Sequence, residues 1–264
     1  MIRLLFLGDL VGEAGRNAAK FVVERLLNEQ AVDFVVVNGE NSANGRGISA
    51  KIAIDLLRSG VAVITTGDHV WDQKDTATYI PTEPRLLRPI NYPPGAPGAG
   101  SIVLDTPKGK VAVMNVQCRT FMNQQLDNPF VAAEEEAHWL RNQTPVIFVD
   151  VHGETTSEKT AMARHLDGVV SAVVGTHTHV QTADERILPR GTAFLCDAGM
   201  CGAIDSIIGR EAGPVIQKFR DGLPARFHVA KGPSQVCGAL IEIDPATGKA
   251  STIQRIREVV EMTH

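Results

Sequence analysis

The sequence predicts an α/β protein, because short apolar runs rich in β-branched residues alternate along the chain with helical patterns. The runs cover residues 2–7, 34–37, 61–64, 111–116, 146–151, 169–174 and 193–196. They are apolar on both faces, which is typical of strands buried inside a sheet. The helical patterns cover residues 16–29, 50–58, 132–141 and 158–166. The alternation indicates βαβ units and a largely parallel sheet.

Two stretches depart from this alternation. Residues 81–100 hold six prolines and several glycines, which predicts an irregular surface excursion that could wall a pocket. Residues 237–243 and 250–256 flank a turn at residues 245–248, which predicts an antiparallel hairpin at a sheet edge. We expect residues 1–264 to form a single domain.

Composition narrows the function classes. The net charge of -4 argues against an extended nucleic-acid surface, although a local metal site could still attract a small anion. The four cysteines form no Cys-x-x-Cys pair, so we expect reduced, mostly buried thiols in a cytoplasmic protein. We expect neither a signal segment nor a membrane span, since no apolar run is long enough. The oligomeric state is left open, a homo-oligomer included.

Polar side chains follow five of the predicted strands at the point where each strand ends. The segments are Gly8-Asp9, Asn38-Gly39-Glu40-Asn41, Thr66-Gly67-Asp68-His69, Asp150-Val151-His152-Gly153-Glu154 and Gly175-Thr176-His177-Thr178-His179. The carboxyl ends of parallel strands lie along one edge of a sheet, where ligands bind. Carboxylate, amide and imidazole ligands without cysteine suit Mn, Fe, Zn or Co and differ from a structural zinc site.

Each motif also has a purely structural interpretation. Asp9, Glu40 or Asp68 taken alone would most often be a turn or capping residue, because loops at strand ends are generally polar. His177 and His179 are a stronger signal, since alternate residues of an extended segment point the same way. The joint occurrence on five strand ends favours a metal site. The remaining histidines, His138, His165, His228 and His264, are interpreted as surface or packing residues.

Together these motifs resemble the calcineurin-like metallophosphoesterases. The longer stretches 38–42, 151–159 and 175–184 resemble the YmdB-like bacterial branch of that family in particular, and the resemblance runs nearly end to end. It implies a four-layer α/β/β/α sandwich of two mixed β-sheets flanked by helices. It also implies two metal ions, with Fe or Mn expected, and a hydroxide between them.

The resemblance assigns the ligands to two sets that share Glu40 as a bridge. One set is Asp9, Glu40, Asn41 and His179, and the other is Glu40, Asp68, His152 and His177. Asp68 stands where the family has Asn, which adds a negative charge. Our hypothesis is that this holds metal more tightly and attracts phosphate less. An Asp68→Asn variant with unchanged metal content and phosphate affinity would contradict it.

The implied activity is that of a phosphodiesterase acting on cyclic nucleotides, either 2′,3′-cyclic or 3′,5′-cyclic. His69, next to a ligand but not needed as one, is our choice of general acid. Arg46 either contacts phosphate or is a solvated loop residue. Two alternatives are a regulatory nucleotide-binding protein with weak catalysis and a metal-dependent amidohydrolase, whose His-x-His motif normally comes early in the chain.

Overall fold

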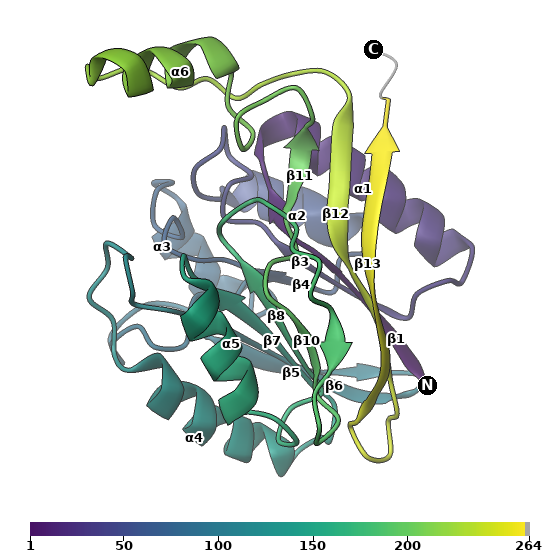
Figure 1. Cartoon of the computed structure of the whole chain (residues 1–264). Coiled ribbons are helices and arrows are strands. Elements are labelled where there is room, and N and C mark those ends of the chain that lie inside the picture. The colour runs from purple at the N-terminus through teal and green to yellow at the C-terminus, as the bar shows by residue number, and fades with distance from the viewer. Residues whose placement is uncertain (262–264) are drawn as a thin grey trace.

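The computed structural model describes residues 1–261, and its strands form two mixed sheets (Figure 1). The seven-stranded sheet has the order β2 (Asp9–Leu10), β11 (Met200–Ala203), β12 (Ser234–Ile243), β1 (Ile2–Leu7), β3 (Phe34–Asn38) and β4 (Val63–Thr65), with β13 (Ala250–Val260) paired to β12. The six-stranded sheet has the order β5 (Ser101–Thr106), β6 (Gly109–Gln117), β7 (Ile147–His152), β8 (Ala172–Thr176), β10 (Ala193–Leu195) and β9 (Arg186–Ile187).

The two sheets pack face to face, and helices cover their outer faces. Side chains on alternate residues of β1 point to opposite sides, as strand geometry requires. Leu4 and Phe6 enter the core between the sheets, where the rings of Phe6 and Phe148 lie 4.9 Å apart. Leu5 instead joins the core beneath the helices of the first sheet. The expected four-layer α/β/β/α sandwich is therefore confirmed, and it refines the single, largely parallel sheet expected from strand alternation.

The helices divide between the two outer layers. Helices α1 (Gly12–Asn28) and α2 (Ala50–Arg58) pack on the first sheet. Helices α4 (Pro129–Arg141) and α5 (Thr156–His165) pack on the second. The short α3 (Thr76–Tyr79) and the 3₁₀ turn η1 (Ile80–Thr82) lead into the proline-rich excursion, which is otherwise irregular as predicted. The last helix, α6 (Ala212–Asp221), projects from the body (Figure 1).

The structure differs from the predicted elements where apolar periodicity is weak. Helix α1 begins at Gly12, four residues before the predicted start, because its first turn carries small residues instead of a leucine stripe. A Cβ on Gly15 would lie 2.0 Å from the carbonyl oxygen of Cys201, so this turn packs closely against β11. Helix α6 buries only Val215 and so lacks a core-facing stripe. The edge strand β5, only half-buried, was also not predicted.

Other expectations about the chain are met in part. The hairpin of β12 and β13 is present and antiparallel. All four cysteines are free and buried. Within residues 1–261, no helix has the length and apolar character to cross a membrane. The single domain over residues 1–264 stays a prediction, and His264 lies outside the described residues.

Candidate metal centre

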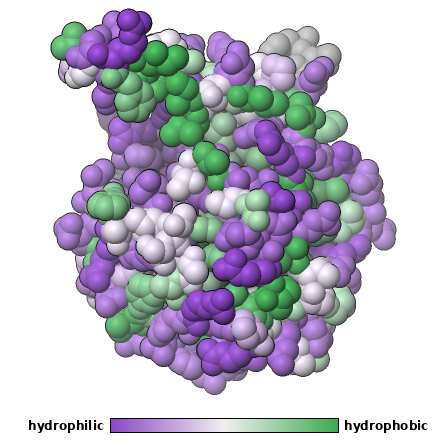
Figure 2. Space-filling view, in the orientation of Figure 1, coloured by the Kyte–Doolittle hydropathy of each residue, from purple (hydrophilic) through white to green (hydrophobic). Residues whose placement is uncertain are grey.

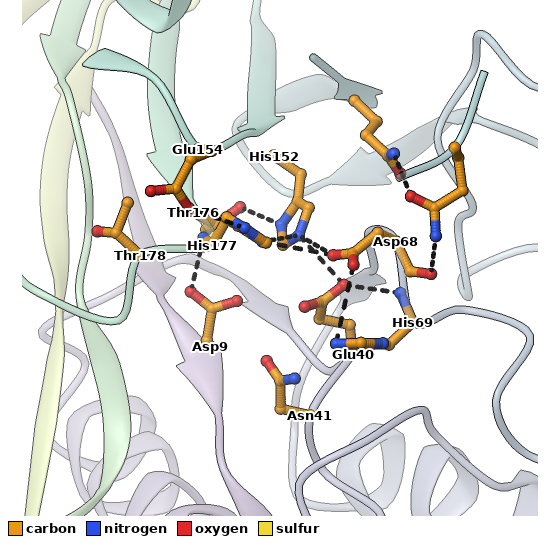
Figure 3. Close-up of polar contacts among 12 residues, drawn as sticks. Asp9, Glu40, Asn41, Asp68, His69, His152, Glu154, Thr176, His177 and Thr178 are labelled. Carbon is orange, nitrogen blue, oxygen red and sulfur yellow. Dashed lines mark hydrogen bonds and ion pairs between the residues drawn. The ribbon is translucent and has the colours of Figure 1, made fainter. Parts of the chain in front are cut away.

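The ends of strands from both sheets meet at one place, where the register aligns them. In the first sheet Asn38 of β3 lies opposite Thr65 of β4. In the second sheet His152 of β7 lies opposite Thr176 of β8. Strand β2 carries Asp9, and the loops that follow β3, β4 and β8 carry the other polar side chains into the same space (Figure 3). The predicted strand-end cluster therefore exists, but two sheets contribute to it instead of one.

Four of the predicted ligands form the tightest group. One ligand atom from each of Glu40, Asp68, His152 and His177 lies within 4.8 Å of the others. The Nε2 atom of His152 is 3.2 Å from Glu40 Oε2 and 3.0 Å from Asp68 Oδ1. The Nδ1 atom of His177 lies 3.3 Å from the same Asp68 oxygen. These four residues are the set that the family resemblance assigned to one metal.

The other predicted ligands lie beside this group. The Nε2 atom of His179 is 3.1 Å from Asn41 Oδ1. Because the Nδ1 of His179 donates to the carbonyl oxygen of Ile208 at 3.0 Å, its Nε2 is left as an acceptor in the neutral ring. Two acceptors this close need a cation or a proton between them. Asp9 is buried, and its Oδ2 accepts a hydrogen bond from the His177 backbone while its Oδ1 has no partner.

His177 and His179 reach the site in a different way from the one predicted. We expected an extended segment, in which residues 177 and 179 would point the same way. Instead His177 has φ of 102° and His179 has φ of 66°, both in the left-handed region that non-glycine residues rarely adopt. The loop therefore turns at each histidine, and one ring faces His152 while the other faces Asn41.

Three carboxylates buried together give the site a strong preference for positive charge. Asp9 and Glu40 are 0% and 1% exposed. Burial raises the pKa of Asp9, as expected for a carboxylate removed from water. Burial alone would lower the pKa of His152, but the charges of Glu40 and Asp68 raise it well above its usual value. Buried carboxylates of this kind are stable only when they are paired or coordinate a metal.

The backbone also makes room for this cluster. A Cβ on Gly67 would lie 2.3 Å from Glu40 Oε2 and 2.2 Å from a ring carbon of His152. Only glycine, which has no Cβ, lets the backbone after β4 approach Glu40 and His152 so closely. The donor set, the orphaned Asp9 oxygen and this close approach all fit metal ions held between the two sheets.

His152 is held from behind by a hydrogen-bonded chain that sequence reasoning did not identify. The Thr176 hydroxyl donates to Asp150 Oδ1 at 2.7 Å, so it accepts from His152 Nδ1 at 2.9 Å. This fixes the proton on Nδ1 and leaves Nε2 facing the cluster. Burial raises the pKa of Asp150 to about 6, while hydrogen bonds from Thr65, Thr176 and Asn38 oppose that rise.

A second carboxylate behind the site also went unidentified. Glu154 Oε2 lies 3.2 Å from His177 Nε2, so that ring turns its Nδ1 towards Asp68. Thr176 is the last residue of β8 and Glu154 lies shortly after the end of β7, so both belong to the polar motifs at these strand ends. Their positions within two residues of a histidine were the only signal that could have pointed to them.

His69 lies at the rim of the cluster and is only partly exposed. Its Nδ1 is 3.0 Å from Asp72 Oδ2, and its Nε2 is 3.8 Å from Asp68 Oδ2. Arg46 does not reach into the cluster in this structure. Its Nε donates to the same oxygen of Asp72 at 2.9 Å, and its side chain is 63% exposed. Its contact with phosphate stays a prediction.

The remaining described histidines lie outside the cluster. His138 is exposed on α4, and His165 pairs with Glu134 at 3.5 Å on the surface. His228 lines a cavity of about 760 Å³ next to the start of α1, which none of the seven predicted ligands borders. These positions agree with their interpretation as surface or packing residues.

Comparison with known proteins points to one family. The sequence profile of the family described as YmdB-like protein matches residues 5–256. A Bacillus subtilis protein named 2′,3′-cyclic-nucleotide 2′-phosphodiesterase is 46% identical over 97% of this chain and 96% of its own. A crystal structure of a hypothetical protein from Thermus thermophilus has a TM-score of 0.91 at 35% identity, covering 98% of this chain and 99% of that one. A structure described as a novel phosphatase, from Mycoplasma pneumoniae, has a TM-score of 0.91 at 36% identity and covers 98% and 94%.

Proposed function

Because this chain belongs to the YmdB-like family, as its motifs predicted, we propose that it is a metal-dependent phosphodiesterase acting on cyclic nucleotides. The observation that carries the proposal is the convergence of Glu40, Asp68, His152 and His177 on one point between the sheets. A surface loop would not bury carboxylates and imidazoles together. A hydrolytic centre for Fe or Mn commonly combines these two ligand types.

We propose the two ligand sets that the family resemblance implies, and the contacts support them. Glu40, Asp68, His152 and His177 would hold one metal, and Asp9, Glu40, Asn41 and His179 would hold the other. When bound, a pair of metals lowers the pKa of a water molecule and neutralises phosphate oxygens. Glu40 is the residue that the two sets share. We expect Fe or Mn, in line with the mixed oxygen and nitrogen ligands.

We propose His69 as the general acid that protonates the leaving group, and its contacts support this role. Asp72 accepts from its Nδ1, so the imidazolium carries its transferable proton on Nε2, on the side of Asp68. Transfer of that proton to the departing alkoxide leaves a neutral ring whose Nδ1–H stays bound to Asp72. Held in this way, the ring needs no metal contact for its role.

For the substrate we propose a small cyclic phosphodiester, with 2′,3′-cyclic nucleotides first and 3′,5′-cyclic nucleotides second. The name of the Bacillus subtilis relative supports the first class. The net charge of -4 argues against an extended surface that would bind a long nucleic acid. Cytoplasmic location and assembly into a homo-oligomer stay predictions.

Hydrolysis of defined substrates tests the proposal. The protein, supplied with Mn²⁺ or Fe²⁺, would be assayed with 2′,3′-cyclic AMP, 3′,5′-cyclic AMP, bis(p-nitrophenyl) phosphate and p-nitrophenyl phosphate. We expect turnover of the diesters, its loss in His152→Asn and its retention in the matched surface variant His138→Asn. Binding of cyclic nucleotide without hydrolysis of any diester would contradict the proposal and favour the regulatory alternative.

A further inference from the structure

A buried ion pair lies behind the loop that carries His177 and His179. Lys159 of α5 is 0% exposed, and Asp197, just after β10, is 1% exposed. The Lys159 Nζ donates to Asp197 Oδ2 at 2.8 Å. Removing two charges from water carries a large desolvation cost, so such a pair adds little to stability on its own. The other hydrogen bonds of the two side chains indicate a different role.

The hydrogen bonds of the pair lead to both sides of His177. Asp197 Oδ2 also accepts from the backbone N of Thr178 at 3.2 Å and from its hydroxyl at 2.8 Å. Lys159 Nζ donates in addition to the carbonyl oxygen of Thr176 at 3.2 Å. The ion pair therefore holds Thr176, before His177, and Thr178, between His177 and His179.

The loop needs such fixing because its backbone is strained. A positive φ is unfavourable for a non-glycine residue, and both His177 and His179 adopt one. Such conformations persist only where the surroundings determine them. The loop is also packed closely at its start, where a Cβ on Gly175 would lie 2.7 Å from the Lys159 side chain.

We propose that the Lys159–Asp197 pair is a positioning device that, through Thr178, sets both histidines in the conformations that face the metals. The proposal rests on the metal-dependent function proposed above. Its distinctive consequence is that one device serves both metals, since His177 and His179 belong to different ligand sets. Glu154 and Thr176, in contrast, each contact a histidine of one set only.

The test is a Mn²⁺ titration of the metal-free protein and its variants, with free Mn²⁺ read by electron paramagnetic resonance. Thr178→Val removes the hydroxyl donated to Asp197 and keeps the shape of a half-buried side chain. We expect both binding steps to weaken by about 10- to 100-fold, the effect typical of partners behind metal ligands. Thr178→Ser keeps the hydroxyl and should restore wild-type binding. Thr247→Val breaks a similar Thr–Asp bond in the β12–β13 turn and should change nothing.

Asp197→Asn is the second variant, with Asp244→Asn as its control. It leaves Lys159 buried without a counter-charge, so we expect weakening of both steps at least equal to that of Thr178→Val. The milder Thr178→Val carries the test if Asp197→Asn does not fold. Wild-type binding in Thr178→Val, or weakening of one step only, would overturn the proposal while leaving diester hydrolysis by the parent protein intact. If the parent protein binds both metals but hydrolyses no diester, only the proposed function is overturned.

Discussion

The two sheets furnish the site in different ways. The first sheet supplies Asp9, Glu40, Asn41 and Asp68, whose oxygens have few side-chain partners outside the cluster. Backbone amides orient two of them, as the amide of His177 does for Asp9 and that of His69 for Glu40. The second sheet supplies the three histidines, and each has a partner behind it. Those partners are Thr176 for His152, Glu154 for His177 and the Ile208 carbonyl for His179.

The difference has a chemical cause. A carboxylate can offer either oxygen to a metal, so the position of its backbone at a strand end is nearly enough to orient it as a ligand. An imidazole must present one bare nitrogen, and a donor–acceptor pair on its other nitrogen fixes which one. We call the ligands of the first sheet the carboxylate half and those of the second sheet the histidine half. We expect metal binding by the carboxylate half to depend on the ligands themselves. Metal binding by the histidine half should depend also on residues that touch no metal.

The largest effect is expected at the residue shared by both ligand sets. Glu40→Gln removes a buried negative charge from between the two sheets. Bound metal stabilises the transition state by roughly several kcal/mol. Because the variant should bind metal poorly, diester turnover should fall by roughly a thousandfold or more. Steady-state kinetics with bis(p-nitrophenyl) phosphate and metal analysis of the purified variant measure this. The exposed Glu24→Gln is the control, and a Glu40→Gln enzyme with full metal content and activity would remove Glu40 from both sets.

The next effect concerns His69, which belongs to neither half. His69→Ala should retain both metals and lose about 10²- to 10⁴-fold in turnover of substrates with an alkoxide leaving group. Bis(p-nitrophenyl) phosphate, whose leaving group needs no proton, should be affected far less. Parallel kinetics on 2′,3′-cyclic AMP and the aryl diester distinguish the two. Loss of metal would show that His69 is a ligand and that the assignment is wrong.

A smaller effect is expected behind His152. Thr176→Val leaves His152 Nδ1 without its acceptor, and metal binding at that set should weaken by about 10- to 100-fold. Thr192→Val, at a buried threonine directly before β10 whose hydroxyl bonds to backbone groups, is the control for lost stability. Mn²⁺ titration of both variants measures the difference. Equal affinities in the two would show that the histidine half does not depend on its outer partners.

The smallest effect is expected at Glu154. Because its side chain is 50% exposed, solvent screens its contact with His177, and Glu154→Gln should weaken one metal by less than about tenfold. The surface pair Glu134–His165 has a similar exposure, so Glu134→Gln is a matched control with no expected change. The same titration reads both. A lower affinity for both metals would mean that Glu154 affects other ligands besides His177.

The same contrast explains how far the sequence could predict this protein. Asp9, Glu40, Asp68 and His152 come at or directly after apolar strands, so their convergence could be predicted from the rule that ligands gather at strand ends. The four layers followed only from the family resemblance, because buried strands of one sheet and of two read alike. Asp197 and Lys159 could not be found, since nothing in a sequence shows that residues 38 positions apart form a buried ion pair.

His177 and His179 were expected to point the same way, but the structure turns them towards different partners. Alternation in an extended segment was the expected cause, whereas two left-handed residues and a tethered Thr178 bring the rings into place. Tertiary contacts decide such conformations, and local sequence patterns do not record them.

Anomalous diffraction from crystals grown with Mn²⁺ would show whether the two ligand sets share Glu40. We expect two anomalous peaks, on either side of the Glu40 carboxylate. One should be contacted by Asp68, His152 and His177, and the other by Asp9, Asn41 and His179. A single peak, or two peaks of which one makes no contact with Glu40, would contradict the shared-ligand arrangement on which the proposed function rests.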